Sequence, residues 1–312
     1  MLHRHIVFAS LLGLTSLAAC AASSSGSACR VGADCMSGIC RSDGTCAPDD
    51  LPQNDAAVFD SDLSDSGSDV IAPGFDAGGC VANNDGTILA SEVPLMAGLK
   101  ATFRVGTNVS NVSTAGATQN DGTRIWDLTA SLSGDHARAV TTDSIVGAWY
   151  APAFTGATYA TRLSESSDLL GVFEKSNNTL SLRGVVSPAD GVTSTKLSYN
   201  PAAVTLQFPL TMNATWTTTA TVTGTLSGYQ SYYTEQYASQ VDAKGLLKTP
   251  FGDFKVFRVR TVLTRTVGVV PTVTRTFAFV AECFGTVATI TSQSNETTVE
   301  FTSAAEVSRL SP

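Results

Sequence analysis

The chain has 312 residues, of which 43% are hydrophobic and only 15% charged, so it holds enough apolar material for a packed core and is not disordered throughout. Its net charge of -8 is concentrated in residues 47–79, which hold eight Asp and neither Lys nor Arg. The segment from Cys80 onward is therefore close to neutral. Because nucleic-acid binding needs clustered Lys and Arg, the composition excludes a nucleic-acid partner.

The first 19 residues have the pattern of a secretory leader. A short polar start around Arg4 precedes an apolar run over residues 6–19. This run is shorter than the roughly 20 residues that a helix needs to span a bilayer, and it ends in small residues, as secretory signals do. We therefore expect export from the cytoplasm.

The last residues of the leader indicate which type of secretory signal it is. It reads Leu17-Ala18-Ala19-Cys20, which resembles the lipobox of bacterial lipoproteins. The resemblance implies that residues 1–19 are removed and that the thiol of Cys20 is acylated, which anchors the chain to a membrane. Ala21 and Ala22 follow, and by the same resemblance they favour the outer membrane of a Gram-negative bacterium. An ordinary cleavable signal is the alternative.

Beyond the leader, changes in composition divide the chain into four parts. Residues 20–28 are a small Ser-rich tether, residues 29–46 a cysteine-rich segment, residues 47–79 an acidic linker expected to be disordered, and residues 80–312 a β-rich globular domain.

The cysteine-rich segment contains Cys29, Cys35, Cys40 and Cys46. It resembles small EGF-like or Dickkopf-like segments, and an exported compartment makes disulfides the expected state. Four cysteines allow three pairings, of which we favour Cys29–Cys40 with Cys35–Cys46. A zinc site is the alternative, although no CxxC pair or His lies nearby. The segment is interpreted either as a protease-resistant spacer or as a small partner-binding unit.

Seven cysteines are an odd number, and acylation of Cys20 restores an even one. Cys80 and Cys283 then remain as a pair. A bridge between them would close a loop of about 200 residues and contribute about 4–5 kcal/mol through chain entropy.

The domain from Cys80 shows a period of two that is typical of half-buried strands. One hairpin is predicted from Trp216 through a turn at Ser227-Gly228 to Val241. A second turns around Gly268 and Pro271. A third pairs residues 284–291 with residues 299–307. Long consecutive hairpins predict a large curved antiparallel meander, which would form a half-barrel, a barrel or a sandwich. Residues 124–128 and 180–186 are expected as further strands, and residues 160–173 as a helix.

Two turns share an Asn-Asp-Gly-Thr core, at Asp85 and at Asp121. A calcium loop needs more oxygen ligands than one carboxylate, so these are interpreted as plain turns. His136 follows Asp135, but no nucleophile motif accompanies it, and it is interpreted as a solvated His in a turn. We expect no enzymatic activity, no metal and no other cofactor.

Two sets of side chains on the later strands have binding and structural interpretations. Arg258, Arg260 and Arg275 with Glu282, Glu296 and Glu300 form either an anion-binding patch or, as we favour, cross-strand ion pairs on a solvated face. Tyr229, Tyr232, Tyr233 and Tyr237 either stack on a ligand or, as we favour, pack within the sheet.

A wider resemblance covers residues 120–265. Its segments are Ile125-Trp126-Asp127-Leu128, residues 206–210, Thr215-Trp216 and residues 241–254. They resemble a β-domain that recurs in secreted bacterial proteins, although Met212-Asn213-Ala214 departs from its pattern. The resemblance implies a fold and no chemistry.

Together these features predict a lipid-anchored envelope protein that displays a non-catalytic β-domain for binding or for a structural or adhesive role, with a protein, glycan or lipid as partner. The alternative is a carrier that holds a lipid or another apolar ligand in the concave face of the curved sheet.

Overall fold

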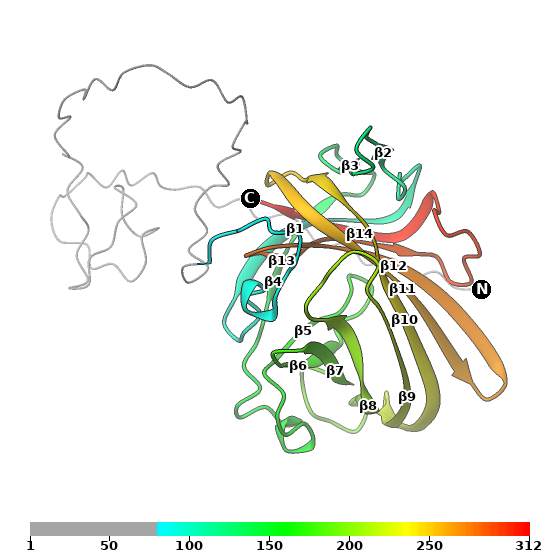
Figure 1. Cartoon of the computed structure of the whole chain (residues 1–312). Helices are drawn as coiled ribbons and strands as arrows, with labels where there is room; N and C mark the ends of the chain where they lie inside the picture. The colour runs from blue at the N-terminus through cyan, green and yellow to red at the C-terminus, as the bar shows by residue number, and fades with distance from the viewer. Residues whose placement is uncertain (1–79) are drawn as a thin grey trace, which may run out of the picture. The chain divides into compact units, whose positions relative to one another are not determined.

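The computed structural model describes residues 80–312, in which fourteen strands form one sheet (Figure 1). Twelve of them follow one another in the order β4-β1-β14-β13-β12-β11-β10-β9-β8-β7-β6-β5, all antiparallel. The strands and the two short 3-10 helices are β1 (Lys100–Ser110), β2 (Ala117–Thr118), β3 (Arg124–Asp127), β4 (His136–Thr141), β5 (Tyr159–Arg162), β6 (Leu170–Lys175), β7 (Thr179–Val186), β8 (Lys196–Gln207), β9 (Thr215–Leu226), β10 (Tyr229–Lys248), β11 (Asp253–Val267), β12 (Val270–Ala281), β13 (Gly285–Ser292), β14 (Ser303–Ser311), η2 (Ala90–Glu92) and η3 (Ala151–Ala153).

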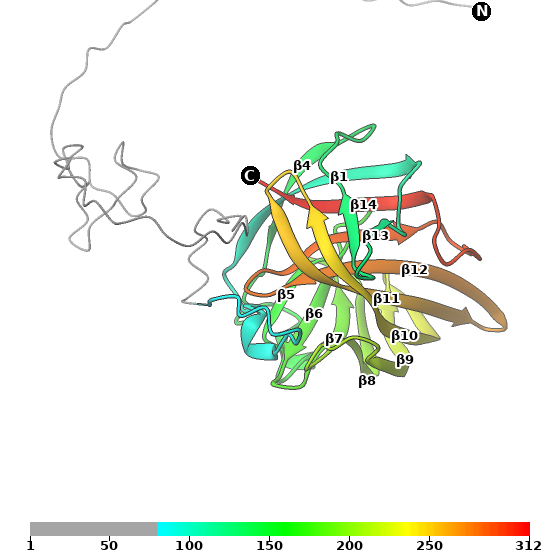
Figure 2. The ribbon, with the colours of Figure 1, turned by 45° about the horizontal axis from the view of Figure 1, so that its top comes forward.

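The sheet curls into a nearly closed barrel (Figures 1 and 2), which confirms the predicted all-β class and the curved meander. The seam of the barrel lies between its end strands, β4 and β5. One bridge crosses it: the Asp143 N–H donates to the Ala160 carbonyl at 2.7 Å, and the Ala160 N–H donates back at 2.9 Å. Glu165 also spans the seam, because its carboxylate pairs with Arg138 and its N–H donates to Glu306 on β14.

The three predicted hairpins are confirmed as β9–β10, β11–β12 and β13–β14, as are the expected strands β3 and β7. The predicted helix over residues 160–173 is wrong. That segment contains β5, a turn and the start of β6, and Tyr159 and Ala160 pair with Phe173 and Val172.

The inner face of the barrel is packed with apolar side chains. Trp216, Ala220 and Val222 of β9 meet Val241 of β10 and Val259 of β11 in one cluster, to which β5–β8 and β12 also contribute. Their alternation along the strands is the period of two seen in the sequence. The interior of the described domain is therefore mainly apolar, although it also holds the buried carboxylate of Glu235.

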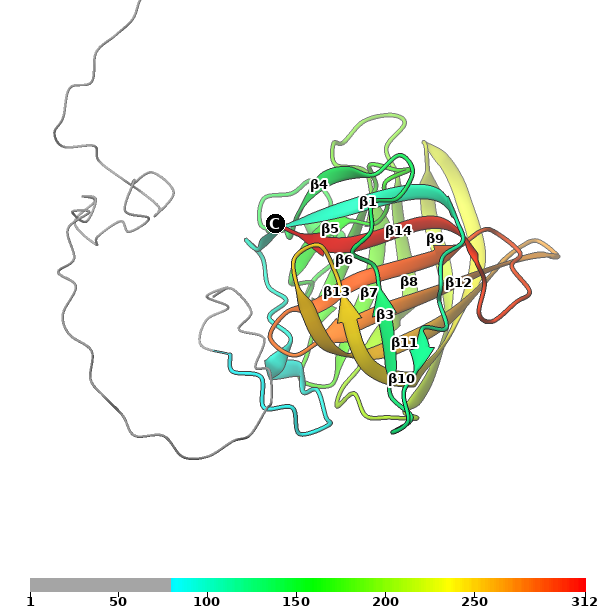
Figure 3. The ribbon, with the colours of Figure 1, turned by 90° about the horizontal axis from the view of Figure 1, so that it is seen from above.

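A second apolar layer covers the outer face of β10–β14. Figures 2 and 3 show the segment around β3 lying over these strands. Its Trp126 packs edge-on against Phe279, with 5.1 Å between the ring centroids. Arg258 lies beneath this cover, only 2% exposed, where it pairs with Asp242 at 2.9 Å and with Glu300 at 2.7 Å. Because of the covering segment, strands β10–β14 have apolar contacts on their outer face as well as on their inner face.

A second buried arginine fastens the same cover to β14. Arg309 is 0% exposed, and its guanidinium donates to the Leu128 and Ala130 carbonyls and to both oxygens of Asp135, the closest at 2.6 Å. Asp135 also accepts from Arg104 of β1 at 3.2 Å. This network links β1, β14 and the segment that follows β3.

The parallel pairing of β3 with β10 depends on a glycine. Gly245 lies opposite Arg124, and a Cβ atom at this position would stand 1.8 Å from the Arg124 carbonyl oxygen. No side chain fits there unless β3 moves away.

We expect Gly245→Ala to lower the free energy of unfolding by about 1–3 kcal/mol, because the added methyl overpacks two backbones. Urea unfolding followed by tryptophan fluorescence measures the change. Gly252→Ala is the matched control, since nothing lies within 4 Å of its Cβ position. Equal stability of the two variants would contradict this role of Gly245.

Several predictions fall outside the described residues: the leader, acylation of Cys20, the bridges among Cys29, Cys35, Cys40 and Cys46, and the acidic linker.

Candidate functional site

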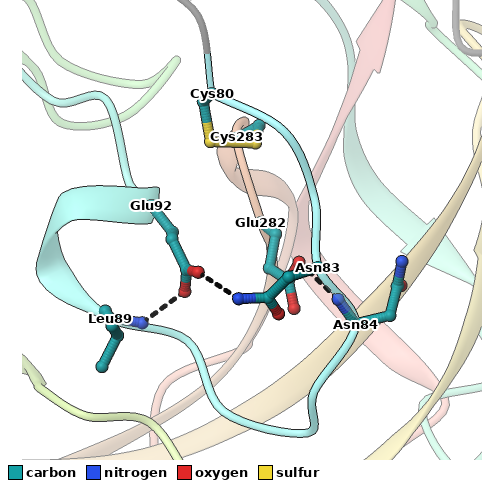
Figure 4. The surroundings of a disulfide bond; sticks show 7 residues. All are labelled: Cys80, Asn83, Asn84, Leu89, Glu92, Glu282 and Cys283. Carbon is teal, nitrogen blue, oxygen red and sulfur yellow. Dashed lines mark hydrogen bonds between the residues drawn. A yellow bond between two sulfur atoms is a disulfide. The ribbon is translucent and has the colours of Figure 1, made fainter.

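The segment from Cys80 to residue 99 lies at the end of the barrel where β12 turns into β13 (Figures 1 and 4). Cys80 and Cys283 are joined in a disulfide with a Cα–Cα distance of 5.5 Å, as the cysteine count predicts. Ile88 forms a bridge with Leu210, which follows β8, and Val93 is buried in the inner apolar cluster. These contacts fix the segment across this end of the sheet.

Polar contacts around the disulfide hold the same segment (Figure 4). Glu92 accepts hydrogen bonds from the Asn83 side chain and from the Leu89 N–H, both at 2.8 Å. The Asn84 N–H donates to Glu282 at 3.0 Å. The segment is therefore held by covalent, apolar and polar contacts together.

A pocket of about 400 Å³ opens beside this segment, which we call the end pocket. It lies where β10 leaves β9 and pairs with β3, against the β10–β11 pair. Its apolar lining comes from Ile88, Ile125, Leu246, Val256 and Phe257.

Three cations and one carboxylate line the end pocket: Arg124, Lys244, Lys255 and Glu282. None of the three cations forms an ion pair with a described residue. Arg124 donates to the Ala115 carbonyl at 2.6 Å, and Glu282 accepts from the backbone. The pocket thus combines an apolar wall with three cationic side chains.

Both Asn-Asp-Gly-Thr turns border the end pocket, through Asn84 and Gly86 on one side and Thr123 on the other. The turn prediction is confirmed, since Gly86 and Gly122 adopt φ angles of 85° and 82°. Asp121 accepts from the Thr123 hydroxyl at 2.7 Å and from the Thr123 N–H at 2.9 Å. These two bonds, with a smaller contribution from nearby Lys244, lower the pKa of Asp121.

His136 is the first residue of β4 and lies at the seam of the barrel. Its Nε2 is 3.2 Å from Glu165, and its Nδ1 is 3.1 Å from the Gly134 carbonyl. Asp135, which precedes it, is engaged by Arg309 and Arg104. Only the doubly protonated imidazole donates to both acceptors, so the Gly134 carbonyl and Glu165 raise the pKa of His136 above 6.5.

An NMR titration of His136 is expected to give a pKa above 6.5. Because the folded pKa exceeds the unfolded one, this His stabilises the fold below pH 6.5 and loses that effect as the pH rises through the folded pKa. Glu165→Gln should move the pKa back toward 6.5. Glu174→Gln, which removes a carboxylate paired with Arg183, should leave it unchanged. If neither substitution changes the pKa of His136, the contact between His136 and Glu165 is contradicted.

The predicted patch of charged residues does not assemble. Arg258 pairs with Glu300 beneath the outer cover, so a solvated face is wrong for this residue. Arg275 donates to the backbone carbonyl of Glu296, while Glu282 lies at the end pocket. The covering segment, which is distant in sequence, changes the environment of these strands.

The four predicted tyrosines divide between two environments. Tyr229 and Tyr232 are 80% and 70% exposed near the β9–β10 hairpin, whereas Tyr233 and Tyr237 face inward. The Tyr237 hydroxyl donates at 2.5 Å to Glu235, which is completely buried and also pairs with Arg265 at 2.6 Å. Burial, followed by the Glu235 charge, raises the pKa of Tyr237. The favoured prediction, that the tyrosines pack within the sheet, therefore holds for Tyr233 and Tyr237 but not for Tyr229 and Tyr232.

Sequence reasoning missed the end pocket and the Asp135–Arg309 pair. Arg124 precedes Lys244 and Lys255 by more than a hundred residues, so the sequence does not show that the three line one pocket. The sequence does show the repeated Asn-Asp-Gly-Thr turns at Asp85 and Asp121. Such a repeat does not reveal that both turns border one pocket.

No protein-family model, curated protein or solved structure matches this chain. Within residues 80–312, no helix has the length and hydropathy that a membrane-crossing helix needs. In the same range, no group of three or more His, Cys, Asp or Glu is placed to hold a metal ion.

Proposed function

We propose that this chain is a lipid-anchored protein of the cell envelope whose β-domain acts by binding and not by catalysis. The leader and Cys20 support the anchor. The end pocket is the observation that carries the binding role, because its volume of about 400 Å³ is within the usual range of roughly 300–1,000 Å³ for small-molecule sites.

The position of the pocket favours one type of binding over another. A carrier that encloses a long apolar ligand needs free space along the concave face of its sheet. Here the inward side chains of β5–β12 form a continuous buried cluster. A ligand held at the end of the barrel, beside the segment that follows Cys80, is better supported than one enclosed along the barrel axis.

A display role for the opposite end of the barrel has its own support. The β9–β10 and β11–β12 hairpins carry exposed apolar side chains there, with Tyr229 at 80% and Val269 at 93% exposure. The Cys80–Cys283 bridge lies at the other end of β12, near Ala281. These tips therefore point away from the point where the preceding chain joins the domain.

The test is to purify the full chain from its own envelope and to record a native mass spectrum. We expect a population with the extra mass of a bound small molecule. A chain that carries no ligand at any stage of purification, and that fractionates with the cytosol, would contradict the proposed function.

A further inference from the structure

We infer that the end pocket selects an anion with an apolar body, namely a carboxylate on an aliphatic or aromatic group. This inference rests on the proposed binding function and specifies its ligand. The contacts that support it come from three separate parts of the fold that meet only at this pocket.

The first observation is the pattern of charge across β10 and β11. Lys244 lies opposite Phe257, and Leu246 lies opposite Lys255. The two lysines are therefore diagonal neighbours on one face, with Cβ atoms about 7–8 Å apart. Their ammonium groups repel each other, and an anion placed between them relieves that repulsion.

The second observation is that β3 adds a third cation to the lining of the pocket. Its pairing with β10 puts Arg124 beside Gly245. One guanidinium nitrogen donates to the Ala115 carbonyl, which leaves further N–H donors on the same group. A planar fork of donors suits a carboxylate, which accepts through two oxygens.

The third observation concerns the remaining carboxylate. Glu282 would oppose an anionic ligand, but it accepts the Asn84 N–H at 3.0 Å beside the Cys80–Cys283 bridge. Three cations and this one carboxylate line the pocket itself. Asp121 and Glu300, which are not part of the lining, interact electrostatically with Lys244 and Arg124 and offset part of their charge.

The fourth observation is the apolar wall. Phe257 and Ile88 are 5% and 3% exposed and belong to the inner cluster, so they present a rigid surface to the pocket. In front of them, Ile125 and Leu246 are only half-buried, and a free inorganic anion would leave these two side chains in contact with water. Burial of an apolar group there gains about 25 cal/mol for each Å² removed from water.

The experiment is isothermal titration of the full mature chain with decanoate, 2-naphthoate, decanol and inorganic phosphate. We expect one of the two carboxylates to bind at least about tenfold more tightly than decanol or phosphate, and which one binds identifies the aliphatic or aromatic source. Affinity should fall as salt is raised.

Variants locate the site. Lys244→Gln with Lys255→Gln should weaken carboxylate binding about tenfold or more, as expected for loss of charge-assisted hydrogen bonds. Lys100→Gln with Lys248→Gln removes the same charge away from the pocket and should leave binding unchanged. Circular dichroism should show that both double variants remain folded.

The outcomes separate the two proposals. Equal binding of decanol and decanoate, unaffected by the lysine changes, would overturn the inference about the anion while a ligand-binding function remains. Carboxylate binding that depends equally on the control lysines would also overturn it. If none of the four compounds binds and the envelope-purified chain carries no ligand, both proposals fail.

Discussion

Asp135→Ala is expected to destabilise the β-domain by about 3–5 kcal/mol, because it leaves the charge of Arg309 buried without its counter-ion. Arg309 is 0% and the Asp135 side chain 3% exposed, so water cannot replace the lost carboxylate. The same change frees the segment after β3, whose Leu128 and Ala130 carbonyls accept from Arg309. Urea unfolding of the full chain, followed by tryptophan fluorescence, measures the loss.

The pH dependence of Asp135 gives a second readout. Burial opposes its ionisation, but hydrogen bonds from Arg309 and from the Leu132 N–H outweigh burial and lower its pKa below 3.8. A lowered folded pKa gives stability that is present above the unfolded pKa and is lost as the pH falls through the folded value. Asp135→Asn should therefore be less stable at pH 7 and lose less stability below pH 3.8.

The control is Asp168→Ala, which removes an exposed carboxylate and should change stability by less than about 0.5 kcal/mol. If the Asp135 and Asp168 variants unfold at the same urea concentration, the buried pair does not hold the cover in place.

Removal of the Cys80–Cys283 bridge is the second large expected effect. The two cysteines are separated by 203 residues, and the chain-entropy relation gives a bridge over such a loop about 5 kcal/mol. We expect Cys80→Ser with Cys283→Ser to lower the free energy of unfolding by up to that amount. Changing both cysteines avoids a free thiol.

Loss of the bridge should also loosen the wall of the end pocket, because its lining residues Asn84, Gly86 and Ile88 follow closely after Cys80. Hydrogen exchange at these amides should rise in the double variant. Under reducing conditions the double variant and the unchanged chain should unfold alike. Identical stability under oxidising conditions would mean that the two sulfurs do not constrain the unfolded chain.

The hairpins could be predicted because their information is local. Alternation along β9 and the Ser227-Gly228 turn are both visible in a short window, and each strand pairs with the next one in sequence. Over residues 160–173 a helix was predicted, where the structure has two short strands. Only the pairing of β5 with β6, which needs both strands at once, decides between them.

The end pocket and the outer cover could not be predicted in the same way. The parallel pairing of β3 with β10 brings Arg124 to Gly245 across 121 residues, and no local pattern encodes it. The cover then buries Arg258, which alternation alone assigned to a solvated face. Asp135 and Arg309 were missed for the same reason, since each looks like an ordinary charged residue until the other is beside it.

Attachment of the chain to a membrane through Cys20 is the claim on which the binding role outside the cytoplasm depends. Intact mass spectrometry of the full-length product, extracted from the membrane fraction with detergent, tests it directly. We predict a mature chain that begins at Cys20, lacks residues 1–19 and carries the added mass of acyl chains on that residue. A chain that retains those residues, or that begins at Cys20 with a free thiol, would contradict the account.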